Sequence, residues 1–182
     1  MKDILPLINH GHIHFGENKV QEGLKKWTDI KSNFTNIKLH MIGKLQTNKV
    51  KYVVPFFDYI HSLDSLKLAE KISNEETKKN KKLKIFIQIN LGNEDQKSGI
   101  SINNLDNFYN KCTKELELNI IGLMCLPPND QNSSVYFSKM EELKNKINLS
   151  DLSMGMSHDY IDAIKYRSTY LRIGTKLFGN RN

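Results

Sequence analysis

Small and hydroxylated residues follow two short apolar stretches near the C-terminus, and residues of this kind bind phosphate. The first stretch, Leu149–Ser153, ends on a serine, and the second, Thr169–Ile173, runs into Gly174 and Thr175. A glycine lets the backbone approach an anion closely, hydroxyl groups donate to it, and N–H groups at a helix start point toward it. Because two separate segments carry these residues, we predict one phosphate site that both of them form.

The elements that must position this site alternate along the chain. The predicted strands are Ile13–Phe15, Ile37–Ile42, Tyr59–Ser62, Lys84–Asn90, Asn119–Met124, Leu149–Ser153 and Thr169–Ile173. The predicted helices between them are Lys19–Ile30, Asn48–Val54, Ser65–Asn80, Ile102–Glu117, Ser133–Ile147 and Asp159–Tyr166, with starts at Asn18, Asp64 and Asp159. The repeated change from helical periodicity to short β-rich runs predicts successive βα units around a parallel sheet.

This order of elements predicts an α/β fold, a (β/α)₈ TIM barrel that lacks its first strand. We count seven strands, and the chain opens at Lys2–Asn9 with a helix of the kind that follows a first strand. A complete barrel has about 250 residues and roughly 200 at the smallest, whereas this chain has 182. We therefore expect residues 1–182 to form a single, N-terminally shortened domain. Its edge strands, Ile13–Phe15 and Thr169–Ile173, should be open and prone to association.

Composition argues against several classes of function. The net charge is +7, from 27 Lys plus Arg against 20 Asp plus Glu. The lysines are spread along every predicted helix without interleaved aromatic residues, so we predict no nucleic-acid binding, only a positive field that attracts small anions. No stretch has the pattern of a signal peptide or a membrane span. Cys112 and Cys125 fit reduced thiols, and we expect a cytoplasmic protein without a membrane partner.

Several sequence segments, taken in order, resemble those of a known family. They are Phe15-Gly-Glu-Asn18, Gln21-Glu22, His40-Met-Ile-Gly43-Lys-Leu-Gln46-Thr-Asn48-Lys49, Gln88-Ile-Asn90, Lys97-Ser-Gly99, Gly122-Leu-Met124, Ser153-Met-Gly-Met-Ser157-x-Asp159 and Arg172-Ile-Gly174-Thr175 with Phe178-Gly179. They resemble the pyridoxal 5′-phosphate (PLP) homeostasis protein family, which consists of single-domain relatives of the alanine racemase barrel. The resemblance covers almost the whole chain. It implies a non-catalytic protein that binds PLP and carries or buffers it in the cell, with PLP-dependent apoenzymes as candidate recipients.

The resemblance also implies the residues that contact the cofactor. The serine, glycine and threonine of the predicted phosphate site would hold the phosphate, with ordinary loop and cap chemistry as the alternative. Arg172 would face the pyridine nitrogen and keep it unprotonated, which weakens the electron sink that a racemase requires; the alternative is a salt bridge at the barrel rim. Asn18 would contact the ring or cap a helix, and Ile42 and Met124 would pack on the ring or in the core. The full predicted set is Ser153, Arg172, Gly174, Thr175, Asn18, Met124, Ile42 and Ser157.

The covalent attachment of the cofactor is where this sequence departs from the family. The family's Schiff-base lysine stands on the first barrel strand, in a segment that has no counterpart here, and no residue of this sequence can be assigned that role. We therefore predict weak, non-covalent PLP binding. If a lysine does attach to the cofactor, Lys44, Lys49 and Lys176 are the first candidates, because each follows a strand end.

Two other functions stay open. One is a shortened, inactive remnant, and the other is a fold-type III PLP-dependent racemase or decarboxylase, against which stand the missing lysine and the missing C-terminal β-domain. We predict no catalytic residue, and we interpret His158 and Asp159 as a helix start. His10, His12 and His14 suggest a metal, but no further ligand lies at suitable spacing, so we predict buried core histidines and no metal.

Overall fold

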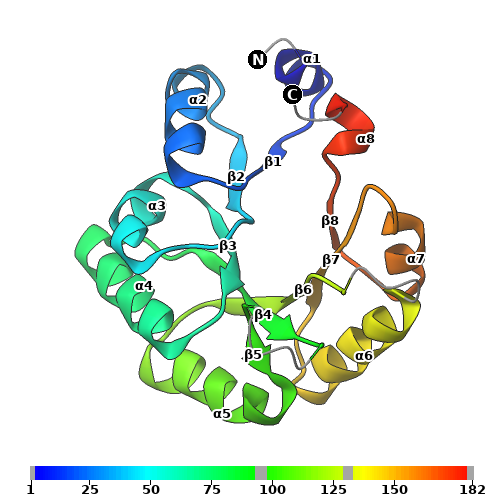
Figure 1. Cartoon of the computed structure of the whole chain (residues 1–182). Helices are drawn as coiled ribbons and strands as arrows, with labels where there is room; N and C mark the ends of the chain where they lie inside the picture. Colours follow the sequence, from blue (N-terminus) through cyan, green and yellow to red (C-terminus); the bar gives the residue numbers. More distant parts are fainter. Residues whose placement is uncertain (1–2, 93–97, 129–132, 180–182) are drawn as a thin grey trace.

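The computed structural model describes residues 3–92, 98–128 and 133–179 and shows a parallel sheet with helices outside it (Figure 1). Lys97, part of one motif named above, lies outside these ranges. The strands are β1 (His14–Glu17), β2 (Lys38–Met41), β3 (Tyr59–Leu63), β4 (Lys84–Asn90), β5 (Ile100–Ser101), β6 (Ile120–Cys125), β7 (Asp151–Met156) and β8 (Tyr170–Arg172). Their order is β1-β2-β3-β4-β6-β7-β8, and the short β5 pairs with the end of β4.

The helices lie outside this sheet, and all except α8 bury apolar residues against it (Figure 1). They are α1 (Ile4–Asn9), α2 (Val20–Asn33), α3 (Val50–Phe56), α4 (Leu66–Lys79), α5 (Leu105–Asn110), α6 (Ser133–Lys146), α7 (Tyr160–Lys165) and α8 (Thr175–Phe178). Trp27 of α2, Ile72 of α4 and Phe137 of α6 are fully or almost fully buried. Because helices cover its outer face, the strands can be rich in apolar residues on both faces. No helix among the described residues is long and apolar enough to cross a membrane.

The sheet curls almost into a barrel and leaves an opening between β1 and β8, beside α1 and α8 (Figure 1). Within the described ranges no pairing joins β1 to β8, and each of these strands is paired on one side only. The α/β barrel predicted from the sequence is therefore confirmed, with a gap between β1 and β8.

One strand boundary differs in a way that matters for the site. β7 runs from Asp151 to Met156, whereas the sequence predicted Leu149–Ser153. Ser153 therefore lies in the middle of the strand and is fully buried. Gly155 has φ of +91°, and a Cβ on it would lie 2.6 Å from the Cβ of Ala163 in α7, so this strand contains a glycine because a helix packs directly against it.

Two predicted helix starts are also corrected. Asp64 was expected to begin α4, but Ser65 is the N-cap residue, and its Oγ accepts a backbone N–H at 3.4 Å. Asn18 was expected to begin α2, but it lies one residue outside the N-cap position. Asp159 does stand at the N-cap of α7, although its carboxylate accepts the N–H of Met156 at 2.6 Å instead of capping its own helix.

Aromatic and imidazole rings fill part of the barrel interior. Tyr59, Phe86 and Met124 form a small buried cluster, with Tyr170 packed against it. The ring of His40 stacks on that of Tyr59, with centroids 4.0 Å apart. These side chains close the bottom of the space that the strand ends surround.

Candidate functional site

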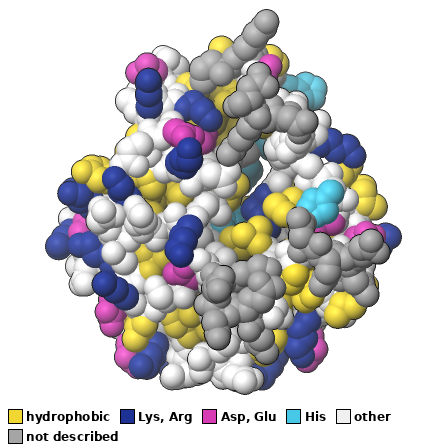
Figure 2. Space-filling model, in the orientation of Figure 1, with side chains coloured by type: hydrophobic (Ala, Val, Ile, Leu, Met, Phe, Trp, Pro, Cys, Tyr) yellow, Lys and Arg dark blue, Asp and Glu magenta, His cyan; other side chains and the backbone are white. Residues whose placement is uncertain are grey.

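A cavity of about 1800 Å³ lies at the C-terminal ends of the strands and extends along the opening between β1 and β8. Its walls come from the ends of β1, β2, β4 and β8, from the loops that follow them, and from α1 and α8. Figure 2 shows a hollow in this face, bordered by hydrophobic, Lys or Arg, and His side chains. The cavity exceeds the roughly 300–1,000 Å³ of a typical ligand pocket because it includes the open seam of the barrel.

Most of the predicted site residues line this cavity. Those that do are Asn18, Ile42, Ser157, Arg172, Gly174 and Thr175. Ser153 and Met124 do not, and both are fully buried. Met124 packs with the aromatic cluster in the core, which was the alternative stated for it. Ser153 lies beneath the cavity, because β7 continues beyond it.

Ser157 is the hydroxyl residue that directly follows β7. Its Oγ accepts the backbone N–H of Lys176 at 3.2 Å, which joins the loop after β7 to the first turn of α8. Gly174 and Thr175 precede that N–H and are exposed. A Cβ on Gly174 would meet nothing within 4 Å, so the space beside this backbone is open. The loops after β7 and β8 therefore lie side by side at the cavity. Ser157, also one of the predicted site residues, stands at the strand end where Ser153 was expected, and the phosphate site itself stays a prediction.

Arg172, the last residue of β8, directs its guanidinium into the barrel. One terminal nitrogen donates to Oγ of Ser153 at 2.7 Å, and the other donates to the carbonyl oxygen of Cys125 at 2.7 Å. Both acceptors are neutral, and no ion pair within the described part of the chain involves Arg172, which argues against the rim salt bridge. Burial lowers the pKa of Arg172 from its ordinary value. A guanidinium still keeps its charge in a protein, so this positive charge faces the cavity without a bound carboxylate.

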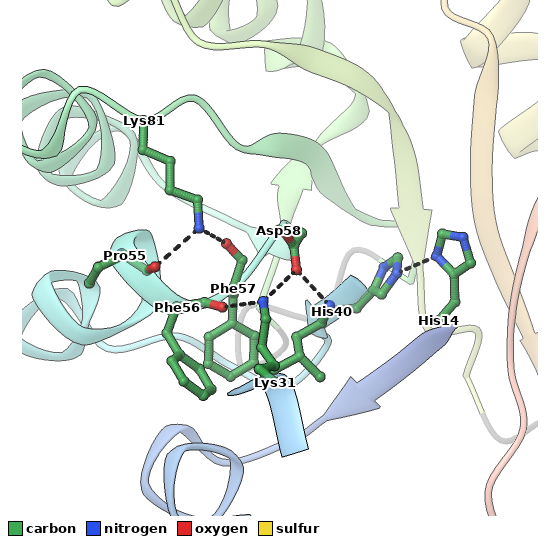
Figure 3. Close-up of polar contacts among 9 residues, drawn as sticks. His14, Lys31, His40, Pro55, Phe56, Phe57, Asp58 and Lys81 are labelled. Atoms are coloured by element: carbon green, nitrogen blue, oxygen red, sulfur yellow. Dashed lines mark hydrogen bonds and ion pairs between the residues drawn. The ribbon is translucent and has the colours of Figure 1, made fainter. Parts of the chain in front are cut away.

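A row of histidines continues from Ser153 across the interior. Nδ1 of His61 lies 2.7 Å from Oγ of Ser153, and Nε2 of His61 lies 2.9 Å from Nδ1 of His40. Nε2 of His40 lies 2.9 Å from Nδ1 of His14, and Figure 3 shows these two rings pointing toward one another. Burial lowers the pKa of His40 to about 3 and that of His61 well below its ordinary value, so both rings are neutral.

Sequence reasoning missed this row because its members come from different strands, far apart in the chain. It predicted His12 and His14 to be buried, but both are exposed, since β1 borders the opening. His12 instead packs edge-on against Phe15, with ring centroids 5.0 Å apart. The described residues contain no group of His, Cys, Asp or Glu side chains arranged to hold a metal.

A second polar cluster lies at the other end of β2 and β3 (Figure 3). The ammonium group of Lys31 donates to a carboxylate oxygen of Asp58 at 3.1 Å, and the same oxygen accepts the N–H of Leu39 at 2.8 Å. Lys81 donates to the carbonyl oxygens of Pro55 and Phe57 at 3.2 and 2.7 Å. These contacts join α2 and the loop after α4 to the end of α3 and the turn before β3, so part of the excess of lysine stabilises the N-terminal end of the barrel.

The three candidate lysines differ in position. Lys44 lines the cavity and is exposed. Lys176 donates to the hydroxyl of Tyr160 at 2.9 Å, and Lys49 lies in a turn before α3, outside the cavity lining. Lys44 is therefore the best placed of the three to meet a ligand.

Known proteins resemble this sequence over most of their length. The chain is 40% identical over 176 residues to the pyridoxal phosphate homeostasis protein of Aquifex aeolicus, which covers 92% of this chain and 76% of that protein. It is 34% identical over 188 residues to the pyridoxal phosphate homeostasis protein of Escherichia coli K12, with 98% and 80% covered.

Solved structures agree with the sequence relatives. PipY of Synechococcus elongatus with PLP bound matches with a TM-score of 0.88 at 31% identity, over 97% of this chain and 86% of that one. An alanine racemase of Clostridium difficile, with a TM-score of 0.75 at 13% identity over 97% of this chain and 47% of that one, shares the fold. The family model of the alanine racemase N-terminal domain matches residues 1–182. The chain thus belongs to the alanine racemase N-terminal domain family and, within it, to the pyridoxal phosphate homeostasis proteins.

Proposed function

We propose that this chain binds PLP non-covalently at the cavity and serves as a non-catalytic carrier or buffer of the cofactor in the cytoplasm. One observation carries the proposal. The loops after β7 and β8 place hydroxyl and N–H donors on one side of a cavity whose interior holds the Arg172 guanidinium without a carboxylate. The cofactor has a phosphate at one end and a ring nitrogen at the other, which suits this pair of features. PLP-dependent apoenzymes are the recipients we propose.

The phosphate would be held by Ser157, Gly174 and Thr175. Hydroxyl groups and backbone N–H groups are strong donors to phosphate oxygens. The openness beside Gly174 leaves room for the anion to meet the backbone. Ser153 is fully buried and hydrogen-bonded to Arg172 and His61. It would not contact the phosphate and would instead hold Arg172 in place.

Arg172 would face the pyridine nitrogen of the cofactor. A guanidinium donates hydrogen bonds and does not give up its proton, so the ring nitrogen accepts and stays unprotonated. PLP supplies an electron sink to enzymes that protonate this nitrogen, and an arginine partner weakens that sink. Ile42, which lines the cavity, supplies apolar contact for the ring, and Asn18 supplies a polar group at its edge.

The test is a titration of the purified chain with PLP, followed by absorbance and equilibrium dialysis, with pyridoxal as the ligand without phosphate. Saturable binding of PLP and much weaker binding of pyridoxal are expected. The double change Ser157→Ala with Thr175→Ala should weaken PLP binding about tenfold or more, because each charge-assisted hydrogen bond contributes about 1.5–3 kcal/mol. Ser150→Ala is the matched control, since Ser150 is exposed and lies outside the cavity lining.

Covalent attachment is tested in the same sample by borohydride reduction and peptide mass spectrometry. No lysine should be modified at stoichiometric yield. Specific modification of one lysine, with Lys44 the first to inspect, would overturn the non-covalent mode. Absence of any saturable binding would favour the inactive remnant.

A further inference from the structure

The hydrogen bonds around Ser153 have one direction in which every donor is paired. Arg172 carries donors and no acceptor, so the Oγ of Ser153 must accept from it. Among the described residues the other partner of this oxygen is Nδ1 of His61, at 2.7 Å. The oxygen has two lone pairs and could accept from both groups, but the buried hydroxyl proton would then have no acceptor among the described residues. Ser153 therefore donates to Nδ1 of His61.

This direction continues from ring to ring. A neutral imidazole carries one proton, so His61, whose Nδ1 accepts, must carry its proton on Nε2 and donate it to Nδ1 of His40. His40 then carries its proton on Nε2 and donates it to Nδ1 of His14. Each ring in the row is held in the Nε2–H tautomer because Arg172 fixes the first step.

We propose that His61 is a positioning residue that receives the proton of Ser153 and so holds its hydroxyl oxygen as an acceptor for Arg172, and that the direction set there passes on to His40 and His14. With its proton committed to His61, the Ser153 oxygen keeps a lone pair directed at the guanidinium. The Arg172 side chain then has a fixed place between this oxygen and the carbonyl of Cys125. The consequence for the cofactor ring rests on the proposed function, whereas the direction of the row does not.

Packing holds the rings in place. His40 stacks on Tyr59 and His61 stacks on Phe86, with centroids 4.0 and 4.4 Å apart. Both imidazoles are almost completely buried, so their hydrogen bonds to protein partners are strong in this surrounding of low polarity.

The charges that face the row disfavour an added proton. His12, Lys38 and Lys84 disfavour a positive charge on His14, and Asp58 is the single carboxylate among the groups that influence it. His40 is influenced by His14, Asp58 and His12, and His61 by His40 and Arg172. His14 is the exposed member of the row and would take up an added proton first. Its Nδ1 would then carry a hydrogen that faces the Nε2–H of His40, so this hydrogen bond would be lost. The row therefore keeps its direction only while His14 is neutral.

Nitrogen NMR of the unliganded protein, labelled at histidine, tests the proposal without any cofactor. His61 and His40 should each show a pyridine-type Nδ1 and a pyrrole-type Nε2 at neutral pH. Ser153→Ala, a small change in volume, should release His61 into a mixture of tautomers, because the group that fixed it is gone. His14→Ala should leave the His61 tautomer unchanged, because the direction is set from the Arg172 end. The proposal would be overturned by an Nδ1–H tautomer for His61 in the wild type. It would also be overturned if His61 lost its Nε2–H tautomer in His14→Ala.

Two variants of His61 then test the effect on Arg172. His61→Asn keeps an oxygen that can accept from Ser153, whereas His61→Leu removes the acceptor. PLP affinity should fall about three- to tenfold in His61→Leu, as expected for one hydrogen bond, and should recover at least in part in His61→Asn. Equal losses in both variants, with thermal melting unchanged, would show that the ring acts by packing alone. If wild type binds no PLP, the proposed function fails while the tautomer measurement still decides the direction of the row.

Discussion

The backbone carbonyl of Asn18 lies so close to Gly43 that a Cβ on this glycine would be 2.1 Å from the carbonyl oxygen. The contact joins the loop after β1 to the loop after β2. The N–H of Ile42 strengthens the same junction by donating to the carbonyl of Glu17 at 3.0 Å. Ser62 reaches the junction from β3, since its hydroxyl donates to the carbonyl of Gly43 at 2.7 Å. Backbone packing therefore fixes the place of Asn18 at the cavity.

Gly43→Ala should separate these two loops. A methyl group cannot occupy that space without a backbone shift, and overpacking of this kind costs about 1–3 kcal/mol. We expect a lower melting temperature and weaker PLP binding. Gly174→Ala is the control for stability, because a Cβ there meets nothing within 4 Å. An unchanged melting temperature for Gly43→Ala would show that the loops are not rigidly joined.

Stability should fall on mild acidification because of the histidine row. Burial lowers the pKa of His14, His40 and His61 from the ordinary value of 6.5, and that of His40 to about 3. The unfolded chain therefore binds more protons than the folded one below pH 6.5. The contribution of the neutral histidines to the free energy of unfolding is fully present above pH 6.5 and is lost as the pH falls toward about 3.

Denaturant unfolding at a series of pH values measures how the free energy of unfolding changes with pH. His40→Phe keeps a ring against Tyr59 but cannot titrate, so its unfolding free energy should depend less on pH. This control also separates the histidines from Glu76, whose raised pKa acts in the opposite sense. An equal slope in both proteins would assign the pH dependence to other groups.

Both thiols should be unreactive in the folded protein. Burial raises the pKa of Cys112 and of Cys125 to about 12, so the thiolate is scarce at neutral pH. Alkylation should be slow in the native state and fast for both residues after denaturation. Rapid native labelling of Cys125 would mean that the barrel interior opens readily.

No amino-acid racemase activity is expected. In the proposed binding mode the guanidinium of Arg172 leaves the ring nitrogen unprotonated, and no residue of this sequence is assigned as the family's Schiff-base lysine. Racemisation of L-alanine should not exceed that of PLP alone. Racemisation above that level, abolished by Arg172→Ala, would contradict this prediction.

The unpaired edges of β1 and β8 should favour self-association. Exposed rows of N–H and C=O groups pair readily with strands of other chains. We expect concentration-dependent oligomers by size-exclusion chromatography, reduced when a strand of family-like sequence is fused before residue 1. A monodisperse monomer that melts cooperatively would show that the barrel tolerates the gap.

The sequence predicted the structure correctly where the local pattern of apolar residues determines it. β4 was predicted with its correct bounds, because its apolar run is clearly delimited, and the gap in the barrel followed from the strand count. β7 was ended too early, because Gly155 and Ser157 are typical loop residues. Only the close packing of Ala163 against that glycine explains a strand there.

Long-range contacts could not be predicted in the same way. His61 and Ser153 are 92 positions apart and meet because their strands face the same interior. Their side chains are polar, and nothing in their local sequence separates a buried hydrogen-bonded pair from two solvated residues. The tautomers of the buried histidines depend further on Arg172, which lies on a third strand, β8.

A closed barrel has no first or last strand, whereas this sheet has two ends and a middle. Amide protons of β4 and β6, paired on both sides, should exchange with solvent only when the whole chain unfolds, and those at the outer edges of β1 and β8 through local opening. Asn18 and Thr175 follow these two end strands, so the cavity is built from the least protected parts of the sheet. A ligand that contacts both residues would connect the two end strands across the opening. It would slow amide exchange most in β1 and β8 and far less in the centre of the sheet.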